Sequence, residues 1–185
     1  MHRTPFLQAL ARYADRHPDE HACTSRYIDF VKGYADCFER SLEIGHITAA
    51  AWILDRAGDR VLLTHHRKLD RWLQLGGHVD GSPDVLAAAS REACEESGIP
   101  SLEPVSAEIF DLDIHPIPAR GEEPEHLHYD ARFLFRATRC ENFTVSDESH
   151  DLAWVPIGQL GEYTEEESIH RMAKKCADRT LLRPV

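Results

Sequence analysis

The fold of this chain is decided by residues 76–99, which read GGHVDGSPDVLAAASREACEESGI. The stretch predicts a glycine-rich loop followed by a helix from about Pro83 to Ser97. Ser82 suits the N-cap of that helix, and Pro83 suits its first position. Gly98 stands where a left-handed residue commonly ends a helix. Both ends of the helix are therefore marked in the sequence.

Three carboxylates share one face of this helix, because Glu92, Glu95 and Glu96 stand at positions i, i+3 and i+4. Like charges this close repel one another, and a purely structural helix gains nothing from them. A hard divalent cation with oxygen ligands would turn the repulsion into binding energy. An arbitrary E-x-x-E-E is more often a solvated acidic face, so the surrounding residues must decide between the two interpretations.

The surrounding residues resemble the Nudix box, which reads Gly, five residues, Glu, seven residues, Arg-Glu-apolar-x-Glu-Glu-x-Gly-apolar. From Gly77 to Ile99 every fixed position agrees except one. The first Glu of the pattern falls on Pro83, and Asp84 lies one residue out of register. The similarity extends over about residues 46–160, so the chain is identified as a member of the Nudix hydrolases.

The resemblance implies an α/β fold, a Nudix-type α/β/α sandwich with a mixed β-sheet and an N-terminal helical extension. The extension would take residues 1–43 and the Nudix domain residues 44–185. A final helix is expected between Glu165 and Asp178. Period-2 patterns predict strands at 47–54, 60–65, 107–117, 126–137 and 152–156, with a short apolar run at 72–75. Helices among such strands predict a mixed sheet with helices packed on it.

Two amphipathic helices are expected before the shared domain, one from Thr4 and one from about Ser25 to Arg40, with a break at Pro18. Their apolar stripes predict packing rather than a catalytic role. The surface that they cover is either the main domain or a second subunit, so a homodimer is one of the expected assemblies.

The resemblance also assigns a metal site and catalytic roles. Glu92, Glu95 and Glu96 would bind Mg²⁺ or Mn²⁺ together with the backbone carbonyl of Gly76. Arg91 would hold the carboxylates in place through charge-assisted hydrogen bonds. The cations would bridge the diphosphate oxygens, polarise phosphorus and help to generate hydroxide from water. Arg91, Glu95 and Glu96 are therefore the expected catalytic residues of the box.

Residues outside the box are expected to complete the site. A carboxylate from a later loop often serves this family as a general base or an additional metal ligand. Glu148 is the expected residue and Asp147 its competitor, and the base must lie within hydrogen-bond reach of the attacking water. Arg67 and Lys68 precede the catalytic loop and are expected to contact a terminal phosphate, the alternative being an ordinary exposed turn.

Strand alternation gathers polar side chains on one face of a hairpin. They are Asp111, Asp113 and His115 on one strand and His126, His128, Asp130 and Arg132 on the next. Two interpretations stay open: a solvated polar face, or the lining of a substrate cleft. In the second, His126 and His128 bind the substrate together with His78 of the loop. A zinc site made by His115, His126 and His128 is a less favoured third interpretation.

The composition limits the classes of partner. The net charge of −11 makes the chain a poor binder of nucleic-acid polymers, because their phosphates repel it. No apolar run reaches the roughly eighteen residues of a membrane span. The five cysteines show no C-x-x-C pairing and predict reduced thiols in a cytoplasmic protein. The expected partner is a small phosphorylated substrate.

The expected function is divalent-metal-dependent hydrolysis of the diphosphate linkage of a nucleoside diphosphate linked to another moiety, or of a similar small phosphorylated substrate. Two alternatives stay open. A Nudix-fold binding or regulatory module without turnover is favoured by Pro83 alone, and the retained glutamates argue against it. An isopentenyl-diphosphate isomerase would need a catalytic Cys in a strand ahead of the helix, and no Cys lies between Cys37 and Cys94.

Overall fold

The computed structural model describes residues 2–121 and 124–177. The helices are α1 (Thr4–Arg16), α2 (His21–Gly33), α3 (Val85–Ser97) and α4 (Glu167–Ala177), with short 3-10 helices at Pro18–Glu20 and Ile157–Glu162. The strands are β1 (Gly45–Leu54), β2 (Arg60–His66), β3 (Arg71–Leu73), β4 (Leu75–His78), β5 (Leu102–Pro104), β6 (Asp111–Ile117), β7 (His126–Ala137) and β8 (Ser149–Pro156). Within the described ranges, no helix has the length and apolar character needed to cross a membrane.

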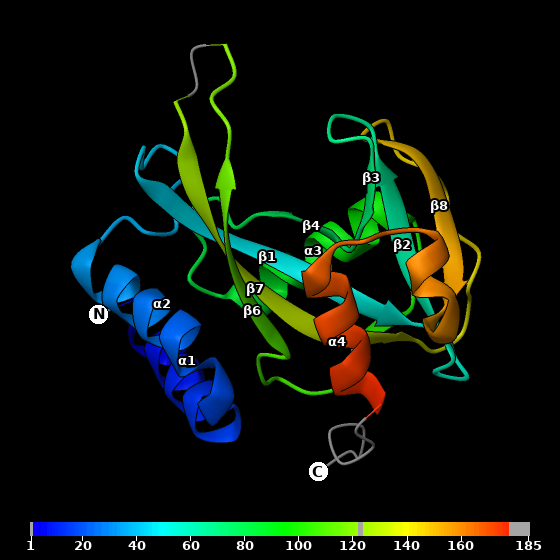
Figure 1. Ribbon diagram of the computed structural model, residues 1–185, viewed down its shortest axis with the longest axis horizontal. Coiled ribbons are helices and arrows are strands. Elements are labelled where there is room, and N and C mark those ends of the chain that lie inside the picture. Colours follow the sequence, from blue (N-terminus) through cyan, green and yellow to red (C-terminus); the bar gives the residue numbers. More distant parts are fainter. Residues whose placement is uncertain (1, 122–123, 178–185) are drawn as a thin grey trace.

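One mixed sheet forms the centre of the molecule (Figure 1). Its main order is β3-β2-β1-β7-β5, while β4 pairs with β1, β6 with β7 and β8 with β2. The pair β1–β7 is parallel, with a register that runs from Gly45 opposite Leu127 to Leu54 opposite Arg136. The other pairs are antiparallel. Every residue of β1 is buried, as expected for a strand covered on both faces.

Alternate residues of β1 face two separate hydrophobic cores. Ile47, Ala49, Ala51 and Ile53 belong to the core that α3 covers with Val85, Ala88, Ala89 and Ala93. Trp52 and Leu54 belong to the core that α4 covers with Ile169, Met172 and Cys176. Figure 1 shows α4 in front of the sheet and α3 behind it. The expected α/β/α sandwich with a mixed sheet is therefore confirmed.

Helix α2 packs on the sheet through Tyr129 of β7, and Phe6 of α1 meets Tyr27 of α2 edge-on at 6.0 Å. Phe30 of α2 stacks on the Tyr129 ring with 3.8 Å between centroids, and Tyr27 meets the same ring edge-on at 5.4 Å. The Tyr27 hydroxyl also donates a hydrogen bond to the Tyr129 carbonyl. Of the two expected surfaces, the main domain is the one that this helical pair covers.

The second helix is shorter than expected, because it ends at Gly33 rather than near Arg40. Tyr34 is already extended, and the guanidinium of Arg3 donates to the carbonyls of Val31 and Tyr34 at 2.6 and 2.9 Å. Glycine disfavours the helix interior, and the arginine satisfies carbonyls that a continued helix would have used.

The start of α3 also differs from the expectation. The N-cap is Asp84, whose side chain accepts from the Ala87 amide at 3.0 Å, and not Ser82. Pro83 therefore lies outside the helix. The expected end is confirmed, because Gly98 is left-handed with a φ of 67°. The short strand β5 was not expected from the sequence, since three residues are too few to show an alternating pattern.

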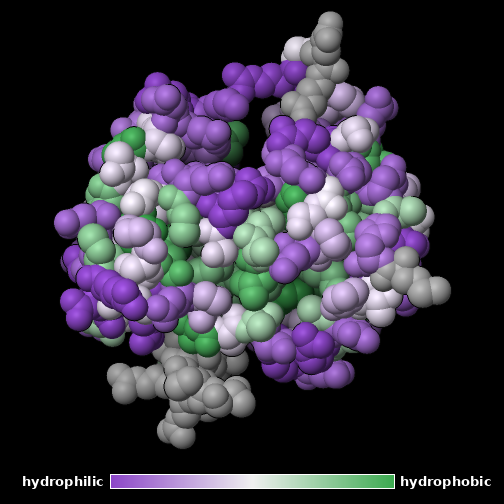
Figure 2. Space-filling view, turned by 180° about the vertical axis from the view of Figure 1, so that it is seen from behind, coloured by the Kyte–Doolittle hydropathy of each residue, from purple (hydrophilic) through white to green (hydrophobic). Residues whose placement is uncertain are grey.

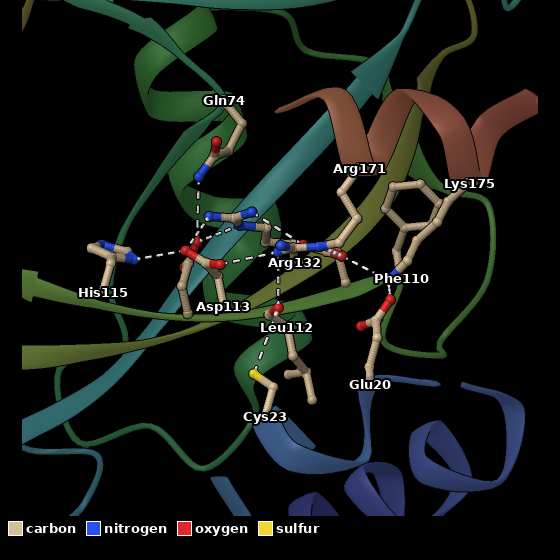
Figure 3. A network of polar contacts seen from close by, with 12 residues as sticks. Glu20, Cys23, Gln74, Phe110, Leu112, Asp113, His115, Arg132, Arg171 and Lys175 are labelled. Atoms are coloured by element: carbon tan, nitrogen blue, oxygen red, sulfur yellow. Dashed lines mark hydrogen bonds and ion pairs between the residues drawn. The ribbon is translucent and has the colours of Figure 1, made fainter. Parts of the chain in front are cut away.

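The polar face of the β6–β7 hairpin is largely buried beneath α4. Arg132 is 2% exposed, and its guanidinium contacts the carboxylates of Asp130 at 2.7 Å, Asp111 at 3.1 Å and Asp113 at 3.2 Å. Asp111 is fully buried and also binds two cations of α4, Arg171 at 2.8 Å and Lys175 at 2.7 Å. Figure 3 shows Arg171 and Lys175 reaching down from α4 to this network. Both open interpretations, a solvated face and a cleft lining, are wrong for Asp111, Asp130 and Arg132.

The face opposite to that of Figure 1 is mostly hydrophilic, with a hydrophobic area near its middle (Figure 2). The large hydrophobic side chains that are exposed in the described ranges are Ile44, Leu69, Val145 and Tyr163. These come from separate segments of the chain. A homodimer therefore stays a prediction.

Candidate active site

Two glycines of β4 allow this strand, which leads toward α3, to lie close against its neighbours. Gly76 and Gly77 pair with Ala50 and Ala49 of β1. A Cβ on Gly76 would lie 2.6 Å from the Ala49 carbonyl oxygen, so the backbone of β1 forbids one. A Cβ on Gly77 would lie 2.5 Å from Oε2 of Glu92. The space beside Gly77 is therefore filled by a carboxylate of α3.

Arg91 connects the loop to the glutamates. Its guanidinium donates to the carbonyl of His78 at 2.8 Å. It also contacts the carboxylates of Glu92 at 2.8 Å and Glu95 at 3.4 Å. Charge-assisted bonds of this kind fix the direction of a carboxylate. One side chain of α3 thus sets the positions of the loop and of two acidic groups.

The electrostatics of the three glutamates differ because their burial differs. Burial raises the pKa of Glu96 to about 8, the charges of Glu92 and Glu148 add to the shift, and a backbone hydrogen bond with Gly76 opposes it. Burial also raises the pKa of Glu92, against the opposing effect of Arg91. The Glu95 side chain is 61% exposed. Two partly buried carboxylates therefore lie in a field of like charge that favours a proton or a cation.

A family model described as the NUDIX domain matches residues 45–176. The chain belongs to the NUDIX family. This agrees with the sequence resemblance, and the expectation of a Nudix-type pyrophosphohydrolase is confirmed at the level of the family. Helices α1 and α2 precede the matched segment. No curated protein matches the chain.

Solved Nudix structures share the fold at low sequence identity. A Caenorhabditis elegans Ap4A hydrolase in a binary complex aligns with a TM-score of 0.57 and 20% identity, over 71% of this chain and 94% of that one. A MutT protein from Methanosarcina mazei Go1 aligns with 0.55 and 18%, over 75% and 97%. The Escherichia coli dihydroneopterin triphosphate pyrophosphohydrolase aligns with 0.54 and 16%, over 70% and 92%.

The charge of Glu148 contributes to the raised pKa of both Glu92 and Glu96, so its carboxylate is within electrostatic reach of the Nudix box. Both Glu148 and its competitor Asp147 are exposed. The carbonyl of Glu148 accepts a hydrogen bond from the Arg67 amide at 3.0 Å, so the loop that carries Glu148 is hydrogen-bonded to the residue that follows β2. The role of Glu148 as a base stays a proposal.

The two basic residues expected to contact phosphate lie in different surroundings. The guanidinium of Arg67 donates to the carbonyl of Ser149 at 2.9 Å and so helps to hold β8. Lys68 is exposed in the turn between β2 and β3. Contact of either side chain with substrate stays a prediction.

The expected substrate ligands His78, His126 and His128 gather around His46, which no sequence pattern indicates as a site residue. The ring of His46 lies 4.9–5.0 Å from each of these three rings, centroid to centroid. His46 stands opposite His128 in the parallel β1–β7 register, and Thr48 stands opposite His78. The cluster could not be found from the sequence, because β1 and β7 are brought together only by a parallel pairing between distant segments.

A pocket of about 660 Å³ lies on the α4 side of the sheet, away from the box. Its lining includes Asp70, Trp72, Asp113, Tyr163, Glu166 and Arg171, and residues of the box are not part of it. Trp72 and Tyr163 meet edge-on with 5.3 Å between ring centroids. The pocket has aromatic and charged walls, but the carboxylate cluster on α3 is the group whose chemistry matches the family.

Proposed function

We propose that this Nudix protein is a divalent-metal-dependent hydrolase that cleaves the diphosphate linkage of a nucleoside diphosphate joined to another moiety, or of a similar small phosphorylated substrate. The observation that carries the proposal is the partly buried pair Glu92 and Glu96, which lies in the field of the charges of Glu95 and Glu148, with Glu92 held against Gly77. Carboxylate oxygens gathered in this way are the donors that hard cations prefer.

The residues present fit Mg²⁺ or Mn²⁺. Glu92 and Glu96 would bind the cation with the carbonyl of Gly76, and Glu95 would join them by turning from its 3.4 Å contact with Arg91. When bound, the cation would polarise the diphosphate and lower the pKa of a coordinated water. Arg91 would keep Glu92 and the His78 carbonyl in place. Glu148 would accept the proton of the attacking water, and Arg67 or Lys68 would bind a terminal phosphate.

The alternative of a binding module rests on Pro83, which is exposed and precedes α3. The isomerase alternative needs a reactive thiol ahead of α3. Burial raises the pKa of Cys37, the nearest preceding cysteine, to about 11, which makes it a poor nucleophile.

Each of the five cysteines is free. Unbridged thiols support our further proposal of a cytoplasmic location.

A substrate panel tests the reaction class. The similar structures are named for hydrolysis of Ap4A and of dihydroneopterin triphosphate, so dinucleoside polyphosphates and nucleoside or pterin triphosphates belong in the panel beside nucleoside diphosphate sugars. With Mg²⁺ or Mn²⁺, we expect release of phosphate or nucleotide from at least one compound, and EDTA should abolish it. Cleavage that persists at full rate in EDTA would contradict the metal dependence.

The Gly77→Ala substitution tests whether the contact between the loop and α3 matters for turnover. The new Cβ would meet the carboxylate of Glu92, which can move at little cost in stability because it is the far end of a flexible side chain. We expect kcat/KM to fall by roughly ten- to a hundredfold, the range for second-layer changes at metal sites, with an unchanged Tm. Gly158→Ala is the matched control, because its new Cβ would meet open space. Equal activity of the two variants would show that the position of Glu92 is unimportant.

A further inference from the structure

The histidine cluster next to the Nudix box has the arrangement of a second ligand set. In the described part of the chain, His46, His78 and His128 are the one group of three potential ligands whose donor atoms all lie within 4.8 Å of one another. The oxygen atoms of Glu92, Glu95 and Glu96 do not come together so closely. The three histidines come from β1, β4 and β7, so their backbones are fixed by the hydrogen bonds of the sheet.

His46 is the most deeply buried member of the cluster. It is 2% exposed, and neither of its ring nitrogens has a partner with normal hydrogen-bond geometry, although the carbonyl of Leu42 lies close enough to affect its pKa. A buried polar atom without a partner costs about 1–3 kcal/mol. Burial and the nearby rings of His78 and His126 lower the pKa of His46 to about 4, so the imidazole is neutral and keeps a lone pair for a ligand.

The neighbouring histidines are engaged elsewhere. Nδ1 of His115 contacts the carboxylate of Asp113 at 3.1 Å, and Nδ1 of His126 contacts the carbonyl of Pro124 at 2.9 Å. The zinc set considered from the sequence was His115, His126 and His128. The histidines whose donor atoms converge in the structure are instead His46, His78 and His128, and this convergence distinguishes the two sets.

We propose that His46, His78 and His128 bind one transition-metal ion of the zinc class, at a site separate from the carboxylates of the Nudix box. Three imidazoles without a carboxylate or thiolate favour such an ion over Mg²⁺, which prefers oxygen ligands. In a tetrahedral site with Zn–N bonds of about 2.0–2.1 Å, the nitrogens lie roughly 3.3 Å apart. The present donor atoms lie within 4.8 Å of one another, so the rings would move closer together on binding.

A metal at this site would tie the end of β4 to the two central strands. His78 directly follows Gly76 and Gly77, and its carbonyl receives the guanidinium of Arg91. The ion would therefore brace the loop on which the carboxylate site rests. Three protein ligands also leave a fourth position for water or another small ligand.

Zinc titration of the chelator-treated full chain tests the proposal. We expect the wild type to bind one equivalent of Zn²⁺ in competition with a chromophoric chelator, and its Tm to rise on binding. The Glu92→Gln/Glu96→Gln double variant should retain this equivalent. His46→Gln and His78→Gln should each weaken it by on the order of 100-fold or more, since even second-layer changes cost about 10–100-fold. Co²⁺ should give the visible spectrum of a tetrahedral nitrogen site in the wild type but not in the histidine variants.

His115→Gln is the matched control, because its ring lies 5.6 Å from that of His128 yet stands outside the proposed set. It should bind Zn²⁺ like the wild type. His78→Gln keeps the proposal testable if the more buried His46→Gln variant does not fold. Circular dichroism checks the folding of both variants. Three results would overturn the proposal: no stoichiometric Zn²⁺ binding by the wild type, loss of binding in the glutamate variant alone, or unchanged binding in folded His78→Gln. Each of these is independent of whether a substrate is cleaved.

Discussion

Replacing Glu96 by Gln should lower kcat/KM by on the order of a thousandfold while leaving the Tm at least as high as that of the wild type. The side chain keeps its volume, so packing is preserved, and only the charge proposed to bind the cation is lost. Burial and the charge of Glu92 raise the pKa of this group to about 8. A carboxyl group whose pKa is higher in the folded state than in the unfolded state destabilises the fold when it ionises. Replacing it by a neutral amide removes this destabilisation.

The measurement is steady-state hydrolysis of the substrate found in the panel, together with thermal unfolding in EDTA. Glu162→Gln is the matched control, because Glu162 is exposed in the 3-10 helix after β8. A Glu96→Gln enzyme with nearly wild-type kcat/KM would remove Glu96 from the catalytic proposal. A large fall in Tm would instead assign it a structural role.

Asp111→Asn should lower the free energy of unfolding by about 3–5 kcal/mol, the usual effect of breaking a buried ion pair from one side. Asp111 is fully buried between Arg132 of β7 and two cations of α4. The amide cannot balance these charges, and α4 would lose its ion pairs from Arg171 and Lys175 to Asp111 of the sheet. Urea unfolding measures the change. Glu108→Gln, which removes a partly exposed partner of Arg12 and Arg16, should cost less than about 1 kcal/mol.

Equal destabilisation by the two changes would contradict the importance of the buried network.

Lowering the pH should destabilise the buried network around Asp111, as the Asp111→Asn substitution does. Burial alone would raise the pKa of Asp111, but Arg171, Arg132 and Lys175 outweigh it and lower the pKa. Such a carboxylate stabilises the fold above its unfolded pKa of about 3.9, and the contribution is lost as the pH falls through the folded pKa. Below about pH 4 the wild type should therefore lose stability more steeply than the Asp111→Asn variant.

Local chemistry explains what could be predicted from the sequence. The helix that carries the glutamates was expected because its residues mark the C-terminus at Gly98 and repeat with helical spacing. The alternating strands β6 and β7 were expected for the same kind of reason. Errors of a few residues arose where competing caps are close together, as with Ser82 and Asp84.

What could not be predicted depends on contacts between distant segments. Alternation placed Asp111, Asp130 and Arg132 on one face, but only the position of α4 shows that this face is covered. The histidine cluster has the same origin. His128 was named from its strand, whereas His46 became visible as its neighbour only through the parallel register of β1 and β7. The box, in contrast, is a local motif that neighbouring residues in the sequence make recognisable, and the roles of its residues stay proposals.

The parallel pairing of β1 and β7 also has a consequence for how the chain folds. Gly45 pairs with Leu127, so the central contact joins residues that are 127 − 45 = 82 positions apart. Contacts of such high sequence separation slow folding, because a long loop must close before they form. At about 5–20 residues per second, a ribosome needs roughly 4–16 s to make the intervening segment. During that interval the newly made β1, which is wholly buried in the finished protein, lacks its partner strand β7, and its exposed apolar surface and unpaired edge are prone to aggregation.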